Sequence, residues 1–239
     1  MHSAKPKLAY YAEILGRLGL PPYEAVMIGN DASEDLVPSR RLGMAVFHIA
    51  EKPEPPFPGG GLDQARQWLK RAAQETDTEA TRTPEAVLAR THGHVGALLS
   101  MASAVRDEEW ARRPAPGAWA PLEIICHLRD AEGEVHLPRL KAILATDNVF
   151  LAAASPDEWA DQRDYLTQSA HEALESFVQT RRQTLHLLVS LAPDEWRRKA
   201  RHALLGPTDL CEVMAGATEH DLLHLAQLRE ASGAAARDH

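Results

Sequence analysis

The chain has 239 residues, enough for one large domain or two small ones, and its 44% hydrophobic and 25% charged residues are ordinary for a globular protein. The formal net charge of −8 argues against a nucleic-acid or anionic-membrane surface, because such surfaces need clustered Lys and Arg. No apolar run approaches the roughly 20 residues that span a bilayer, and the first residues lack the apolar core of a signal peptide. We therefore expect a cytoplasmic protein, and its two cysteines make no disulfide framework.

The first 75 residues are predicted to form a small α/β segment. Apolar residues at helical spacing indicate a helix at 8–20, and short apolar runs at 25–29 and 44–49 indicate two strands separated by a helix that Gly43 ends. Four prolines and three glycines then interrupt residues 51–61 before one more helix. Two strands leave unpaired edges. The segment is therefore expected to pack on the rest of the chain, to pair with a second copy or to be partly disordered.

From Thr83 onward the strand signals disappear, and the pattern predicts long helices. Residues 76–83 are predicted to be a polar linker, after which Thr83 caps a helix that has Pro84 at its first position. Four helices are expected, at about 84–106, 121–146, 161–191 and 208–231. The fold class is therefore mainly α: a four-helix bundle over residues 84–232, preceded by the α/β segment and followed by a tail at 233–239.

Three histidines are predicted to face the interior of this bundle. At about 100° per residue, His224 lies within the apolar arc of the last helix and His220 on its edge, while His127 lies beside the apolar arc of the second helix. Burying three imidazoles without partners would cost a few kcal/mol for each ring. A divalent ion would offset that cost, since imidazole is a common ligand of Zn, Ni, Cu and Fe. The alternative is three separate histidines hydrogen-bonded to carboxylates.

The segments around these histidines resemble a known family. The stretch "GAWAPLEIICHLRDAE" (117–132) and the pair in "EHDLLH" (219–224) are similar to the DinB-like (YfiT-like) superfamily of metalloenzymes over residues 84–232. The resemblance implies a four-helix bundle, often dimeric, that binds Zn or Ni through His127, His220 and His224. It also implies a small-molecule substrate, with transfer of a low-molecular-weight thiol as the best precedent and hydrolysis next. One departure is Ala120, where the family has Ser or Thr, which weakens the helix cap by about 1 kcal/mol.

Two acidic residues are candidate catalytic groups near the predicted metal site. Asp221 falls between the two histidines of the last helix, where it would orient a ligand imidazole or act as a general base, with a helix-edge salt bridge as the alternative. Glu132 is expected to support the same ligands. His136 and His171 are expected at the surface, and Cys126 is expected to point outward, so no thiol nucleophile is predicted.

Residues 1–75 resemble the C-terminal end of a haloacid dehalogenase-like hydrolase. Lys5, before Pro6, matches the motif whose Lys steadies a phosphorylated nucleophile, and Asp31 and Asp35 match the motif whose carboxylates help to hold Mg²⁺. A polar loop that caps a helix is the alternative explanation of the two acids. The motif with the nucleophilic Asp is missing, so neither Mg²⁺ binding nor phosphatase activity is expected from this chain alone, and the three residues would be vestigial.

The leading prediction is therefore a metal-dependent transferase or hydrolase that uses an ion held by three histidines as a Lewis acid. A binding or stress-response module whose metal site has no turnover is the first alternative, and a phosphatase of the N-terminal segment is the second. The sequence does not specify the metal, the substrate or whether the bundle dimerises.

Overall fold

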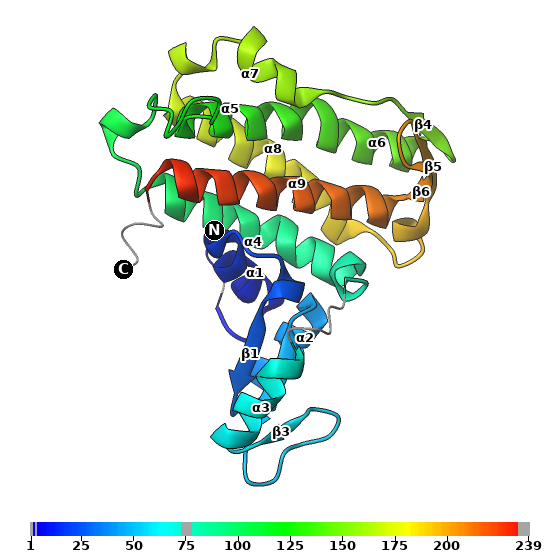
Figure 1. Cartoon of the computed structure of the whole chain (residues 1–239). Helices are drawn as coiled ribbons and strands as arrows, with labels where there is room; N and C mark the ends of the chain where they lie inside the picture. Colours follow the sequence, from blue (N-terminus) through cyan, green and yellow to red (C-terminus); the bar gives the residue numbers. More distant parts are fainter. Residues whose placement is uncertain (1, 3, 73–77, 234–239) are drawn as a thin grey trace.

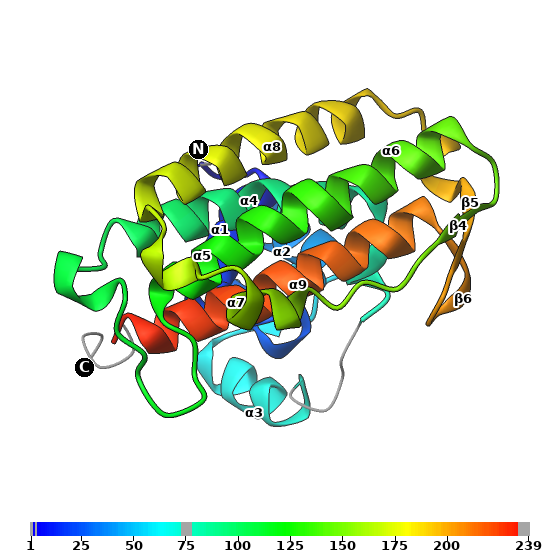
Figure 2. The same ribbon diagram turned by 90° about the horizontal axis from the view of Figure 1, so that it is seen from above.

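Four long helical rods lie side by side in the computed structural model, which describes residues 2, 4–72 and 78–233 (Figures 1 and 2). The rods are α4 (Pro84–Ala102), the continuous run of α5 (Pro121–Ala131), a π-helical segment (Glu132–His136) and α6 (Leu137–Ala145), then α8 (Ala170–Ser190) and α9 (Leu210–Ala231). Helix α4 packs against α8 and α9, and α5 packs against the same two helices. This arrangement confirms the predicted four-helix bundle.

The third rod begins later than predicted. Residues 159–162 form a separate short helix, α7 (Trp159–Gln162), and Asp164 adopts a left-handed conformation with φ of 48°, which no continuous α-helix can accommodate. A single 3₁₀ turn follows, and α8 starts only where the Ser169 side chain accepts a hydrogen bond from the Glu172 amide at 3.3 Å. The expected helix at 161–191 was therefore wrong over its first two turns.

A small sheet closes one end of the bundle, contrary to the expectation that strands end before Thr83. It consists of β4 (Val149–Leu151), β5 (Lys199–His202) and β6 (Gly206–Asp209), with β4 parallel and β6 antiparallel to β5. These strands have three or four residues, too few for a period-two pattern to be distinguished from loop sequence. The β5–β6 hairpin leads directly into α9, so it fixes where that helix begins.

The N-terminal segment contains the two predicted strands and a third that two glycines form. All three strands are parallel, in the order β1-β2-β3. Its elements are α1 (Leu8–Leu18), β1 (Val26–Gly29), α2 (Val37–Leu42), β2 (Ala45–Ile49), β3 (Gly59–Gly60) and α3 (Leu62–Ala72). The third strand was missed because Gly59 and Gly60 carry no side-chain signal.

Helix α1 docks this segment on the bundle by a close crossing with α4. A Cβ atom at Gly93 of α4 would lie 2.7 Å from the Glu13 backbone nitrogen, and one at Gly16 of α1 would lie 2.9 Å from the Ala97 Cβ. Only glycine permits this approach, which buries Tyr11 and Leu15. Of the three outcomes considered for the segment, packing on the bundle is the one that the structure adopts.

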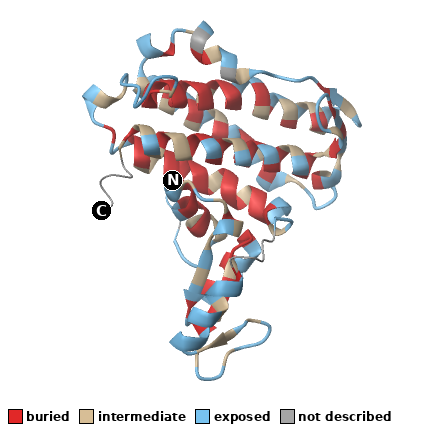
Figure 3. Cartoon of the chain, in the orientation of Figure 1, coloured by how far each residue is buried: buried red, intermediate tan, exposed pale blue. Residues whose placement is uncertain are grey.

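The interior of the bundle has an apolar cluster at each end and polar side chains between them. One cluster is centred on Leu98, Ile124, Phe177 and Leu225, and the other, at the end closed by β4–β6, on Leu140, Ile143, Leu188 and Met214. Buried residues line the inner faces of the helices (Figure 3), and the buried polar ones lie between the two clusters along each helix. We call five of them the polar layer: His94, Glu132, Arg181, Thr184 and Asp221.

The described residues include no helix that combines the length and the apolar character needed to cross a membrane. Residues 76 and 77 of the predicted linker, and residues 234–239 of the predicted tail, lie outside the described residues. The boundaries at 75 and 84 stay predictions, although Thr83 caps α4 as expected by accepting from the Ala86 amide at 3.3 Å.

Candidate metal centre

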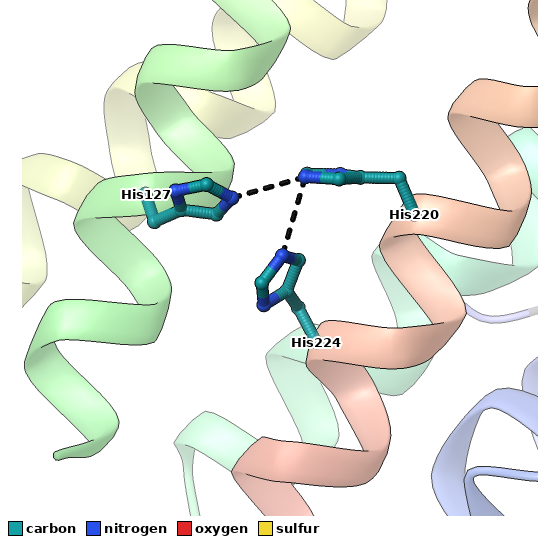
Figure 4. A group of neighbouring side chains, drawn as sticks. All are labelled: His127, His220 and His224. Atoms are coloured by element: carbon teal, nitrogen blue, oxygen red, sulfur yellow. Dashed lines mark hydrogen bonds between the residues drawn. The ribbon is translucent and has the colours of Figure 1, made fainter. Parts of the chain in front are cut away.

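The three predicted histidines converge at one point inside the bundle. His127 extends from α5, and His220 and His224 extend from consecutive turns of α9 (Figure 4). The Nε2 atom of His220 lies 3.0 Å from Nε2 of His127 and 3.2 Å from Nε2 of His224. One nitrogen of each ring lies within 4.8 Å of the others. The helical-periodicity argument therefore placed all three side chains on the correct faces.

Burial keeps the imidazoles of His127 and His220 neutral. Desolvation, with a smaller contribution from the neighbouring His224 ring, lowers the pKa of His127 to about 3, and the same two effects lower the pKa of His220 to about 2. A neutral imidazole has one lone pair for a cation and one N–H for a hydrogen bond. The chemistry of the donor set therefore fits a divalent transition metal, which needs unprotonated nitrogen ligands.

Neighbouring groups fix how two of the rings present their nitrogens. The Nδ1 atom of His224 lies 2.8 Å from Oε1 of Gln227, which can only accept, so Nδ1 carries the proton and Nε2 directs its lone pair at the cluster. The Trp119 ring stacks on His224 with an interplanar angle of 3° and a centroid distance of 5.5 Å, and it also contacts His127. Trp119 lies just before α5, within the stretch 117–132 that resembles the family.

The helix that carries His127 begins without a side-chain cap at Ala120, yet the sequence provides a substitute. The Glu123 carboxylate reaches back and accepts a hydrogen bond from the Ala120 backbone nitrogen at 2.8 Å. Arg113 in turn holds Glu123 with two hydrogen bonds, one of them 2.9 Å long. The departure from the family pattern is therefore partly compensated, because half of a capping box remains.

Asp221 is buried, so its carboxylate has little contact with solvent for proton exchange. Its two oxygens accept hydrogen bonds from Arg181 at 2.7 and 3.0 Å, and one of them lies 3.6 Å from Nδ1 of His94. Burial raises the pKa of Asp221, but the Arg181 guanidinium outweighs that effect and holds the pKa well below its usual range. The contacts of Asp221 are those of a buried ion pair with Arg181, which was not predicted, rather than of a salt bridge at an exposed helix edge.

Glu132 joins the same network from the opposite side of Arg181. Its Oε2 accepts from the guanidinium at 2.8 Å, and its Oε1 accepts from the Thr184 hydroxyl. Asp221 and Glu132 are therefore linked through one buried cation, and Arg181 was not a sequence candidate because charged residues are seldom fully buried. The contacts of Glu132 are compatible with the expected supporting role.

His136 was expected at the surface, but it adjoins the centre. Its Nε2 lies 3.5 Å from Nδ1 of His220, and with His220 and Asp221 it forms a second group of potential ligands. Nine residues of α-helix would turn His136 about half a circle away from His127, at about 100° per residue. The π-helical segment adds one residue to a turn and removes about 100° of that rotation. A bulge of this kind has no signal in apolar periodicity.

Both cysteines are buried, and burial raises the pKa of each thiol to about 11. Cys126 was expected to point outward, but it belongs to the first apolar cluster because α5 is covered on several sides. A thiol with this pKa is a poor nucleophile at neutral pH.

The residues singled out in the N-terminal segment contact one another rather than the histidines. The Lys5 ammonium lies 2.5 Å from Oδ1 of Asp35. Asp31 caps the next helical turn, accepting from the amides of Ser33 at 2.9 Å and Glu34 at 2.8 Å, and the second of these bonds is the largest cause of its lowered pKa. The capping contacts are those of the polar-loop alternative.

These observations define a class: a four-helix bundle with three histidines that converge in its interior. The family model for the DinB superfamily matches residues 93–228, more than half of the chain. The chain therefore belongs to the DinB superfamily.

Among solved structures, the chain is similar to YfiT from Bacillus subtilis, described as a probable metal-dependent hydrolase with an unusual four-helix bundle topology. The two share 17% sequence identity with a TM-score of 0.54, over 77% of this chain and 93% of that one. This likeness supports the fold. No curated protein matches the chain.

Proposed function

We propose that this chain is a metal-dependent hydrolase that holds one divalent transition-metal ion through His127, His220 and His224. The observation that carries the proposal is the convergence of three imidazole nitrogens, from two helices, within 4.8 Å of one another, with His127 and His220 held neutral by burial. The description of YfiT as a probable metal-dependent hydrolase adds support. Zn and Ni are the metals we expect, since both accept imidazole ligands.

When bound, such an ion supplies Lewis-acid catalysis by lowering the pKa of a coordinated water or thiol and by polarising a substrate. The protein orients the imidazole rings of the proposed ligands. Gln227 and Trp119 fix the plane of His224, and His136 offers a hydrogen-bond partner to the far nitrogen of His220. Because Arg181 occupies both oxygens of Asp221, we assign Asp221 and Glu132 a positioning role rather than a role in proton transfer.

Metal analysis tests the proposal directly. Purified full-length protein should contain about one transition-metal ion per chain, and His224→Ala should lose it. The matched control is His171→Ala, because His171 is an exposed histidine on α8. Metal well below one ion per chain in the wild-type protein after incubation with Zn²⁺ or Ni²⁺ would refute the site.

Thiol transfer is the second reaction to test, because the family resemblance includes it. Metal-loaded protein should be assayed with activated esters and amides, and in parallel with bacillithiol or glutathione plus an electrophile. Hydrolysis that depends on His127 supports the proposal, whereas turnover only in the presence of a thiol supports transfer. Tight metal binding without turnover in either panel would favour a binding module.

The N-terminal segment is proposed to be a haloacid dehalogenase-like remnant with a structural role. Its Lys5–Asp35 ion pair and the capping role of Asp31 support that assignment. Hydrolysis of p-nitrophenyl phosphate that disappears in Asp31→Asn would instead support a phosphatase. A homodimer stays a prediction that sedimentation analysis can test.

A further inference from the structure

A pocket of about 580 Å³ opens beside the histidine cluster. Its wall includes His136 and His220, residues of α6 and α9, and the β5–β6 hairpin. The sequence did not predict this pocket, because the β5–β6 hairpin that completes it was not predicted. Because His220 lines the pocket, a small molecule bound there would lie beside the centre.

One wall of the pocket carries a cation without a carboxylate partner among the described residues. Arg139 lies one turn after His136 on α6, and its guanidinium donates a hydrogen bond to the Ala152 carbonyl at 2.9 Å. No carboxylate of the described chain lies within ion-pair distance of Arg139, although the side chain is half-buried and burial lowers its pKa. A desolvated guanidinium with unused N–H groups favours an anionic ligand, above all a planar carboxylate.

His202, on β5, supplies a second donor in the same pocket. Its Nδ1 accepts hydrogen bonds from the amides of Leu204 at 3.2 Å and Leu205 at 3.4 Å, so in the neutral ring the proton is on Nε2. Desolvation and the nearby positive charge of Arg139 lower the pKa of His202. The ring therefore offers an N–H rather than a second full charge.

The pocket also has acidic residues, but they do not neutralise Arg139. The Glu212 carboxylate is held at the start of α9, where Thr208 donates to it at 2.8 Å and the Asp209 amide at 3.3 Å. Glu158 is exposed at the rim. The donor groups of Arg139 and His202 are thus available to a ligand.

The remaining wall is apolar and unusually exposed. Leu204 and Leu205, at the tip of the hairpin, are 76% and 69% exposed, and both line the pocket together with Val135 and Val213. Two adjacent exposed leucines on the rim of a pocket are favourable only when an apolar group covers them.

We propose that this pocket binds the substrate as an amphipathic monoanion, an organic carboxylate with a short apolar chain. The carboxylate contacts Arg139 and His202, the apolar chain covers Leu204 and Leu205, and the reacting group faces His220. The direction of the reacting group rests on the proposed function, whereas binding of the anion does not.

Calorimetric titration of the full-length protein tests the binding. Octanoate and 1-octanol are the probes, and EDTA is present so that the carboxylate cannot coordinate a metal. Octanoate should bind about ten-fold more tightly than 1-octanol, because a charge-assisted pair is lost in the alcohol. Arg139→Gln should remove this preference and leave 1-octanol binding unchanged, whereas Leu204→Ser with Leu205→Ser should weaken both ligands.

The control is Arg201→Gln, since Arg201 is exposed and precedes His202 on the opposite face of β5. It should bind both probes as the wild-type protein does. Equal affinity for the two probes, or octanoate binding that survives Arg139→Gln, would overturn the inference. Metal content is measured separately on EDTA-free aliquots of the same preparations after incubation with Zn²⁺ or Ni²⁺. Selective octanoate binding by protein that takes up no metal would refute the proposed function and leave the pocket assignment standing.

Discussion

The two apolar clusters of the bundle and the polar layer between them come from the same four helices, yet they contribute to the protein in opposite ways. The clusters bury side chains such as Leu98 and Leu140 and so provide the hydrophobic driving force. The polar layer buries a guanidinium and two carboxylates, whose desolvation offsets much of their mutual attraction. The apolar clusters therefore account for the folding of the bundle. The presence of the polar layer is better explained by its position next to the histidines of the candidate metal centre.

The largest expected effect comes from removing the cation of the polar layer. Arg181→Leu leaves Asp221 and Glu132 buried without a counter-charge, and it should lower the free energy of unfolding by about 3 to 5 kcal/mol. Urea unfolding at neutral pH in EDTA measures this loss. Adding Asp221→Asn and Glu132→Gln to the Arg181→Leu variant should recover much of it. A triple variant as unstable as the single one would contradict the charge-pairing argument.

An apolar substitution should affect stability without affecting the metal site. Leu98 is 1% exposed in the first cluster, so Leu98→Ala should cost about 3 kcal/mol through lost burial and a cavity. The number of metal ions per chain should stay at the wild-type value. Leu223→Ala, at a 57% exposed position of α9, is the control and should change stability by less than about 0.5 kcal/mol. Metal loss in Leu98→Ala at temperatures where it stays folded would weaken the separation of roles.

The contrast between the apolar clusters and the polar layer also explains which features could be predicted from the sequence. Helical periodicity and the His-x-x-x-His spacing are properties of single helices, so they correctly oriented His127, His220 and His224. The bundle followed from four long amphipathic stretches with polar or proline-rich connections. Arg181 could not be found in this way, because its burial depends on two carboxylates that approach it from other helices.

Other parts of the site were hidden by local irregularities. The π-helical segment shifts the phase between His127 and His136, and the β5–β6 hairpin that carries His202 has strands too short to show a pattern. Both irregularities lie beside the candidate site. This is where local sequence rules are expected to fail, since functional sites tolerate geometry that a regular element would avoid.

Replacing Gln227, the hydrogen-bond partner of the proposed metal ligand His224, should have the opposite effect to Leu98→Ala. Metal binding should weaken while stability changes little. Gln227→Leu removes the group that holds the Nδ1 proton of His224, and it should weaken Zn²⁺ binding by about 10- to 100-fold. Stability of the metal-free protein should change by less than about 1 kcal/mol, because Gln227 is only partly buried. Competition with a chromogenic chelator measures the affinity, and Gln183→Leu, at an exposed position of α8, is the control. Unchanged affinity would argue against His224 as a ligand.

The smallest expected effect is a change in the pH dependence of stability. His94 is buried against Asp221, Arg181 and Arg90, and burial lowers its pKa. At pH values above about 6.5, the His94 ring is neutral in both the folded and the unfolded chain, so its protonation does not reduce the free energy of unfolding. As the pH falls below that value, the unfolded chain takes up a proton before the folded one, so the free energy of unfolding decreases.

In EDTA, His94→Gln should therefore lose less stability than the wild-type protein between about pH 7 and pH 5. His171→Gln, which changes an exposed histidine of α8, should retain the wild-type slope. Identical slopes for His94→Gln and the wild-type protein would show that His94 does not couple the polar layer to pH.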